Sequence, residues 1–131
     1  ALQLYLTVGV AHIASAMSSQ IKPLAQMIYD GMDYPGFAVV HVQSPCTEYN
    51  DTYEQLKGNP KKGIEPLAWQ IPEDHDRTNI AAAHDIVNKG GVPLGIIYQA
   101  EHRKPLDKRI AEMSASAKVR TAEDMLNTYT I

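Results

Sequence analysis

The sequence predicts an α/β fold in which helices cover a mainly parallel, doubly wound sheet. The first observation is the apolar segment 37–42, whose near-continuous pattern is typical of a strand buried on both faces. The second is the order strand, helix, strand, since a short apolar segment at 10–14 and a helical pattern precede it. The third is another apolar segment at 92–98, which supplies a further strand.

The first third of the chain contains the most regular pattern. Residues 1–6 suit the end of a helix, although their alternating leucines leave a strand open. A helix is expected over residues 19–33, because Ser18 and Ser19 are good caps and Pro23 is tolerated in a first turn. Its apolar residues recur at helical spacing and predict one buried stripe: Ile21, Leu24, Ala25, Ile28 and Met32.

The remainder of the chain is less regular. Glycines and prolines interrupt residues 47–77, where an ordered but irregular segment is expected. A helix to about residue 88 follows, with Asp76 or Thr78 as its cap. The strand at 92–98 begins with a proline and contains a glycine, which favours an edge position. The tail 105–131 is charged and weakly periodic, and a final helix is expected after Thr121.

Composition limits the possible functions. A chain of 131 residues with 44% hydrophobic content can form one compact domain, and one domain over residues 1–131 is expected. The net charge of -3 gives no general electrostatic reason to bind nucleic acid or an anionic membrane. No apolar run approaches the roughly 20 residues that span a bilayer. A single cysteine cannot form an internal disulfide, which favours a reducing compartment such as the cytoplasm.

Cys46 is the candidate functional residue. It follows the strand at 37–42 through Pro45, at the strand end where open parallel sheets place their ligands. Taken alone, a lone cysteine is more often a small buried hydrophobe. A turn rich in backbone donors also suits a thiolate that binds iron or zinc, and this remains the alternative. The chain has no second cysteine, so by itself it cannot provide four thiolate ligands.

The other titratable groups give weaker signals. His12 and His41 lie in apolar segments and are expected in the core rather than as ligands. His75 and His84 lack the i, i+4 spacing that would place two imidazoles on one helical face. The charged cluster at 74–77 is expected to cap a helix and to form surface ion pairs. None of these groups predicts a catalytic residue.

The segment 36–50 resembles the Ser-Pro-Cys segment of the β subunit of 2-oxoacid:ferredoxin oxidoreductases. Its motif Ser-Pro-Cys-x-x-Tyr-Asn occupies residues 44–50 and is fairly specific when it follows a strand. Three further segments fall in the order found in that family: 9–16, 75–78 and 92–98. The resemblance covers about residues 9–104.

The resemblance implies a fold of the thiamine-diphosphate-binding type. Such enzymes convert a 2-oxoacid and CoA to an acyl-CoA and carbon dioxide, and pass two electrons to ferredoxin. They use thiamine diphosphate, Mg²⁺ and a [4Fe–4S] cluster, and the β subunit works with an α subunit. In the family the cysteine of Ser-Pro-Cys is the last of four cluster ligands, and Cys46 matches that position. The 2-oxoglutarate type is favoured over the pyruvate type.

The sequence also departs from the family. The thiamine-binding Gly-Asp-Gly segment, its magnesium-binding asparagine and the other three cluster cysteines belong upstream of the matching region and are absent here. The chain is therefore expected to be a carboxyl-terminal portion of a β subunit, with an incomplete sheet. Alone it is expected to be catalytically inert, to bind no cofactor and to self-associate through an exposed sheet edge.

Two other functions remain open at the level of sequence. The chain could belong to a thiamine enzyme without a cluster, in which Cys46 would be structural. It could also be a non-catalytic domain that binds a partner protein through its exposed edge.

Overall fold

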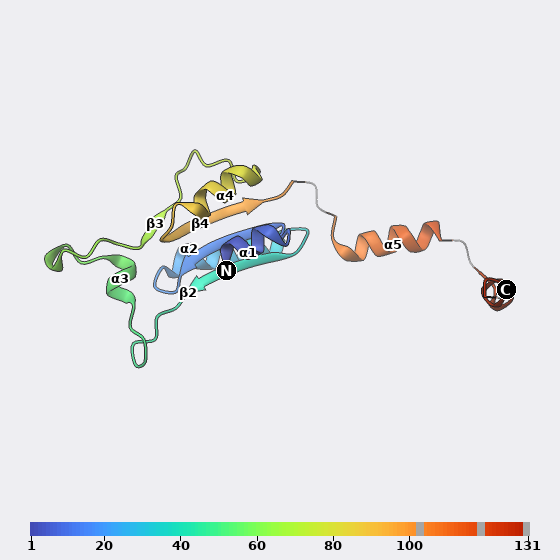
Figure 1. The fold of residues 1–131 in the computed structure, drawn as a ribbon, viewed down its shortest axis with the longest axis horizontal. Coiled ribbons are helices and arrows are strands. Elements are labelled where there is room, and N and C mark those ends of the chain that lie inside the picture. Colours follow the sequence, from blue (N-terminus) through green and yellow to red (C-terminus); the bar gives the residue numbers. More distant parts are fainter. Residues whose placement is uncertain (102–103, 118–119, 130–131) are drawn as a thin grey trace.

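The computed structural model contains a four-stranded sheet with helices on both faces and a helical arm (Figure 1). The structure describes residues 1–101, 104–117 and 120–129. The sheet order is β2-β1-β4-β3. The strands are β1 (His12–Met17), β2 (Ala38–Gln43), β3 (Ala68–Gln70) and β4 (Val92–Gln99). Two of the three pairings, β1–β2 and β3–β4, are parallel and β1–β4 is antiparallel, which confirms the mainly parallel α/β class.

Helices cover the two faces of this sheet. α1 (Leu2–Thr7) and α4 (Ile80–Asn88) pack on one face, where the main core lies. That core contains Leu6, Val10, Ile13, Ala83, Ile86 and Ile97. α2 (Ile21–Asp33) covers the other face and connects β1 to β2, as the sequence predicted.

The prediction that residues 37–42 form a strand buried on both faces is wrong. β2 lies at the edge of the sheet, all six of its residues are half-buried, and Phe37 before it is 70% exposed. The fully buried strand is β1, which has a hydrogen-bonded neighbour on each side. Because β2 has β1 as its one neighbour in the described sheet, its outer side has no cover.

The edge position predicted for the strand at 92–98 is also wrong. β4 lies between β1 and β3 and pairs with each of them over a different part of its length. Residues 92–94 pair with β3, whereas residues 95–99 pair with β1. Pro93 therefore lies outside the part that pairs with β1, so its missing N–H does not interrupt that ladder.

The apolar stripe predicted for α2 does not face the sheet. Ile21 and Met32 are 74% and 82% exposed, and no residue within 21–33 is buried. The sheet-facing side instead passes through Gly31, where an added Cβ would lie 3.5 Å from that of Ala38 and 3.6 Å from Val40. Gly31 therefore lies next to β2, and the larger side chains of the stripe lie on the other side of α2.

The cap predicted for the helix that ends near residue 88 is wrong by one position or more. The side-chain oxygen of Asn79 accepts hydrogen bonds from the backbone N–H groups of Ala81 and Ala82 and caps α4. The Asp76 carboxylate instead accepts from the N–H and hydroxyl of Thr78, which forms a turn just before the helix.

The remaining elements are short or lie outside the sheet. They are α3 (Tyr53–Lys57), the 3₁₀ helix η1 (Pro60–Lys62), α5 (Leu106–Ser116) and α6 (Ala122–Asn127). The predicted helix after Thr121 is confirmed, with a capping box between Thr121 and Asp124. α5 forms where only a charged tail was expected, and it extends away from the sheet (Figure 1). Within the described residues, no helix is long and apolar enough to cross a membrane.

Candidate functional site

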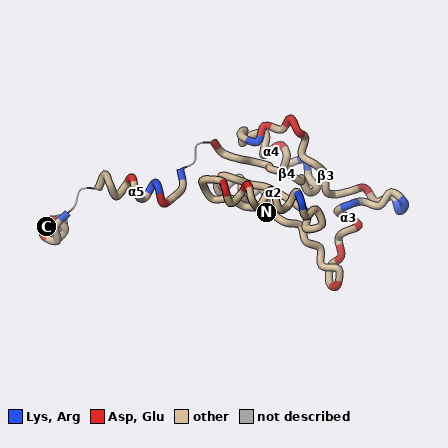
Figure 2. Tube along the Cα trace, turned by 180° about the vertical axis from the view of Figure 1, so that it is seen from behind, with Lys and Arg blue, Asp and Glu red and all other residues tan. Residues whose placement is uncertain are grey.

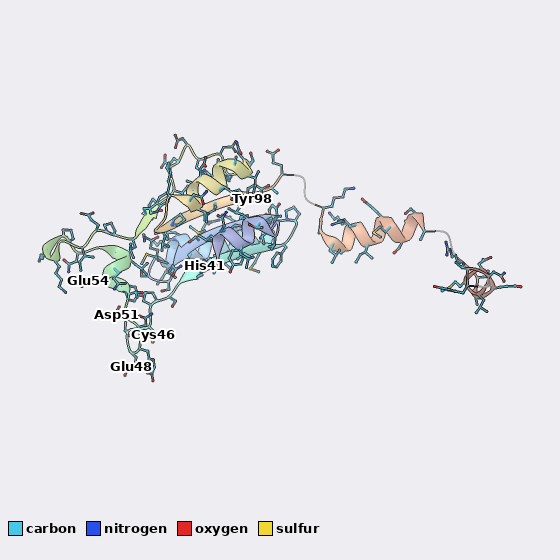
Figure 3. The ribbon with its side chains drawn as sticks, viewed as in Figure 1. His41, Cys46, Glu48, Asp51, Glu54 and Tyr98 are labelled. Atoms are coloured by element: carbon cyan, nitrogen blue, oxygen red, sulfur yellow. The ribbon has the colours of Figure 1, made fainter. Side chains whose placement is uncertain are left out.

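Cys46 lies on a loop that projects from the carboxyl end of β2 (Figure 3). β1 and β2 are parallel, so this is the edge where both strands end. The thiol is exposed, which makes the interpretation of Cys46 as a small buried hydrophobe wrong. Proline at residue 45 ends the strand, and the chain turns outward instead of continuing across the core.

Hydrogen bonds define the shape of the Cys46 loop. The N–H of Asn50 donates to the carbonyl oxygen of Cys46 at 2.9 Å and closes a tight turn. The carboxylate of Asp51 then accepts from the N–H of Tyr53 at 3.0 Å, at the start of α3. The hydroxyls of Tyr53 and Ser18 lie 3.4 Å apart, which connects α3 to the end of β1. The exposed thiol thus lies on a turn whose conformation these hydrogen bonds stabilise.

The same turn stabilises the charged form of the thiol. The backbone N–H of Tyr49, followed by those of Glu48 and Asn50, lowers the pKa of Cys46 below its usual value of 9.0 by hydrogen bonding to the sulfur. Partial desolvation opposes this shift but does not cancel it. Three backbone donors around one sulfur form an environment suited to a thiolate that binds metal.

Alkylation of Cys46 tests this electrostatic effect. We expect the rate of reaction with iodoacetamide to rise with pH through a midpoint below 9.0, because the thiolate is the reacting form and its pKa is lowered. The chain unfolded in urea is the control, since it keeps the only cysteine but loses the turn. Equal midpoints for the folded and the unfolded chain would contradict the proposed role of the backbone donors.

Within the described residues, no cluster of three or more histidine, cysteine or acidic side chains could hold a metal ion. The nearby Glu54 accepts from Asn59 at 2.7 Å and pairs with Lys62 at 2.8 Å, and the Lys62 hydrogen bond is the main cause of its lowered pKa. Cys46 is therefore the one thiol on the described part of the chain, and a metal site built on it would need further ligands from elsewhere.

His12 lies in the core, as the sequence predicted, whereas His41 on the edge strand β2 is only half-buried. His12 is fully buried, and burial lowers its pKa, with Asp30 acting in the opposite direction. Neither of its ring nitrogens has a hydrogen-bond partner among the described residues, and its ring lies 5.3 Å from that of Tyr34. Nε2 of His75 lies 2.8 Å from the carbonyl oxygen of Ile97. These contacts indicate structural roles.

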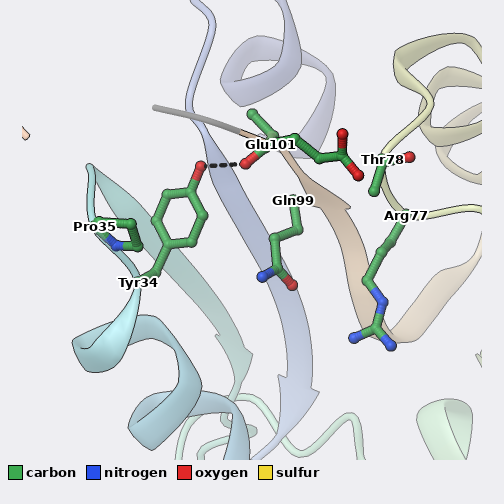
Figure 4. A pocket seen from close by; sticks show the side chains of 7 residues that line it. Tyr34, Pro35, Arg77, Thr78, Gln99 and Glu101 are labelled. Atoms are coloured by element: carbon green, nitrogen blue, oxygen red, sulfur yellow. Dashed lines mark hydrogen bonds between the residues drawn. The ribbon is translucent and has the colours of Figure 1, made fainter. Parts of the chain in front are cut away.

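A hollow of about 480 Å³ lies at the other end of the sheet, where β4 ends (Figure 4). Its lining comes from three distant segments: Tyr34, Pro35, Arg77, Thr78, Gln99, Ala100 and Glu101. The Tyr34 hydroxyl donates to the carbonyl oxygen of Ala100 at 2.7 Å and closes one side. The sequence analysis did not find this hollow, because no motif connects segments so far apart in the chain.

The fold and the loop define an α/β chain that presents one exposed thiol at the carboxyl edge of a parallel strand pair. Residues 65–115 match a family model described as pyruvate ferredoxin oxidoreductase β subunit, C terminal. Over 115 residues the chain is 26% identical to a 2-oxoacid:ferredoxin oxidoreductase subunit β from Saccharolobus solfataricus, covering 82% of this chain and 38% of that protein.

Two further comparisons identify the same kind of protein. The chain is 25% identical over 122 residues to 2-oxoacid:ferredoxin oxidoreductase 1, subunit β, from Aeropyrum pernix, covering 85% of this chain and 37% of the relative. It is also similar to a solved 2-oxoglutarate:ferredoxin oxidoreductase from Magnetococcus marinus with 2-oxoglutarate, coenzyme A and succinyl-CoA bound. That similarity has a TM-score of 0.72 at 25% identity and covers 99% of this chain and 44% of the solved one.

The resemblance inferred from the Ser-Pro-Cys motif is thereby confirmed. The chain is similar to the β subunits of 2-oxoacid:ferredoxin oxidoreductases, and its mainly parallel α/β fold is similar to part of a solved 2-oxoglutarate:ferredoxin oxidoreductase. It spans less than half the length of the relatives described here.

Proposed function

We propose that this chain is the part of a 2-oxoacid:ferredoxin oxidoreductase β subunit that provides the Cys46 thiolate to a [4Fe–4S] cluster. The enzyme would oxidatively decarboxylate a 2-oxoacid to an acyl-CoA and reduce ferredoxin. The observation that carries the proposal is the exposed Cys46 thiol on a fixed turn, with backbone donors directed at its sulfur. The family of the relatives supports the same assignment.

The residues present fit one sulfur ligand of a cluster. A cluster ligand has to be a thiolate, and the lowered pKa of Cys46 favours that form. N–H groups that hydrogen-bond to a ligand sulfur also tune the reduction potential of a bound cluster. The other three cysteine ligands would come from residues outside this sequence, which has no second cysteine.

The remaining cofactors and partners follow from the same proposal. Thiamine diphosphate with Mg²⁺ would supply the carbanion chemistry, and the cluster would carry electrons to ferredoxin. We propose an α subunit, ferredoxin and CoA as partners and 2-oxoglutarate as the favoured acid, supported by the ligands of the Magnetococcus marinus structure. Residues 1–131 would form the carboxyl-terminal part of a thiamine-diphosphate-binding domain, and the chain alone would be catalytically inert. Because its single cysteine cannot form an internal disulfide, the chain would work in the reducing cytoplasm.

The test replaces Cys46 in the full-length β subunit assembled with its α partner. We expect Cys46→Ala to remove the cluster and ferredoxin reduction together, measured by iron content, the EPR signal of the reduced enzyme and 2-oxoacid-dependent electron transfer. Glu48→Gln is the matched control, because it changes an exposed side chain of the same loop and leaves its backbone N–H in place.

The two results separate the alternatives. Loss of iron in Cys46→Ala with normal iron in Glu48→Gln supports the ligand role. Unchanged iron and electron transfer in Cys46→Ala would contradict it and would favour a structural cysteine in an enzyme whose cluster, if present, is bound elsewhere.

A further inference from the structure

The loop that carries Cys46 is anchored at its two ends. Residues 44–52 connect β2 to α3, and none of their side chains is buried. At the start of the loop, the N–H of Ser18 donates to the carbonyl oxygen of Gln43, the last residue of β2, at 2.9 Å. Beyond its end, Leu56 of α3 is 5% exposed and packs against β1 and β4. Between these anchors, hydrogen bonds rather than packing determine where the Cys46 sulfur lies.

Asp51 makes the side-chain hydrogen bond that joins the Cys46 turn to α3. Its Oδ1 accepts the N–H of Tyr53, the first residue of α3, at 3.0 Å. The preceding residue, Asn50, donates its N–H to the Cys46 carbonyl oxygen at 2.9 Å and closes the turn. Apart from the Cys46 sulfur, no other side chain of residues 44–52 makes a hydrogen bond within the described part of the chain. In Figure 3 Asp51 lies between Cys46 and α3.

A fixed turn is an advantage for a metal ligand. A sulfur that already lies in its bound position loses little conformational entropy when it binds. The bond that closes the turn and the bond made by Asp51 involve neighbouring residues, so loss of the Asp51 bond allows the turn to move relative to α3. The backbone N–H groups of Glu48 and Tyr49 act on the Cys46 sulfur from within the same turn and would move with it.

We infer that Asp51 is a positioning residue of the [4Fe–4S] site, because its carboxylate fixes the Cys46 turn on α3. The inference rests on the proposed function, since it requires Cys46 to be a cluster ligand. Asp51 would act through the backbone of residues 50–53. Its role is therefore to keep the sulfur in place before and after the cluster binds.

Charge has to be separated from position in any test. Acidic residues recur along this loop, at Glu48 and Asp51 (Figure 2). A carboxylate near a bound cluster also acts on the cluster through its negative charge. Asp51→Asn removes that charge but keeps a side-chain oxygen that accepts the Tyr53 N–H, whereas Asp51→Ala removes both. The difference between these two variants therefore reports the hydrogen bond alone.

Amide hydrogen exchange of the 131-residue chain, measured by NMR, tests the turn without a cluster. We expect the Asn50 amide to exchange about three- to tenfold faster in Asp51→Ala than in the parent chain or in Asp51→Asn, because the turn opens more often. Glu48→Ala is the matched control, because it removes an exposed carboxylate from the same turn and leaves the bond between Asp51 and Tyr53 in place. Equal exchange rates in Asp51→Ala and Asp51→Asn would overturn the inference.

Iron release from the assembled enzyme tests the consequence for the cluster. In the full-length β subunit with its α partner, we expect a chelator to remove iron about three- to tenfold faster from Asp51→Ala than from Asp51→Asn. Glu48→Ala should release iron at the rate of the parent enzyme. Complete absence of iron in Asp51→Ala, with normal iron in Asp51→Asn, is the extreme form of the same result and supports the inference.

The two possible failures are distinguishable. Equal rates of iron release from Asp51→Ala and Asp51→Asn, with iron lost in Cys46→Ala, would overturn the role of Asp51 and leave the proposed function intact. Iron retained in Cys46→Ala would overturn the proposed function, and the positioning of a cluster ligand by Asp51 with it. Far-UV circular dichroism checks that every variant keeps its helices.

Discussion

Replacing Gly91 by alanine is expected to lower the free energy of unfolding by about 2–5 kcal/mol. Gly91 has a φ of +66°, and a Cβ there would lie 2.5 Å from the carbonyl oxygen of Leu67 and 3.2 Å from the ring of Trp69. The same oxygen accepts the N–H of Val92 at 2.7 Å, at the start of the β3–β4 pairing. Relief of the overlap therefore has to move the backbone that sets this register.

Gly90→Ala is the matched control for this experiment. Gly90 has a φ of +80°, but a Cβ there would have no atom within 4 Å, so alanine costs only the left-handed backbone, about 1–2 kcal/mol. Urea denaturation of both variants measures the difference. Equal losses in the free energy of unfolding at the two positions would contradict the prediction, because they would mean that the backbone relieves the overlap at Gly91 without a cost in stability.

Replacing Ile97 by alanine is expected to lower the free energy of unfolding by about 2–5 kcal/mol. Ile97 is 0% exposed and belongs to the core that joins β1, β4, α1 and α4. Truncation removes apolar contacts and leaves a cavity between two helices and the sheet, which close packing cannot fill without moving them.

A graded series separates the cavity from other causes of this loss. Ile97→Val should cost about 0.5–1.5 kcal/mol, because it removes one methyl group. Val8→Ala, at an exposed position after α1, should change stability by less than about 0.5 kcal/mol. If Ile97→Ala cost no more than Val8→Ala, the assignment of Ile97 to the core would fail.

Local patterns in the sequence predicted the helices and strands themselves better than their burial and their positions in the sheet. The β1–α2–β2 unit and α4 follow from periodicity and end signals. The exposure of β2 does not, because an apolar strand has the same sequence pattern whether it has one neighbour or two. α2 shows the same limit: its sequence contains an apolar stripe at helical spacing, but the spacing does not determine which side of the helix faces the sheet.

The motif predicted where the candidate site lies in the fold, but it did not predict the environment of the Cys46 thiol. Residues 44–50 placed Cys46 at a strand end, and the structure agrees. The exposure of the thiol and the backbone donors around it depend on the path of the loop, which composition does not contain. The hollow near Tyr34, Arg77 and Gln99 could not be predicted, since only the folded sheet brings these residues together.

The central position of β4 has a consequence for the order in which the chain folds. His12 pairs with Ala38 in β2 and also with Gln99 in β4, which is far more distant in the sequence. Closing the longer loop costs about 1 kcal/mol more in chain entropy than closing the shorter one. The β1–α2–β2 unit therefore nucleates at the lower cost, and the arrival of β4 brings the non-local contacts that slow folding. The strand that completes the core is then among the last to join it.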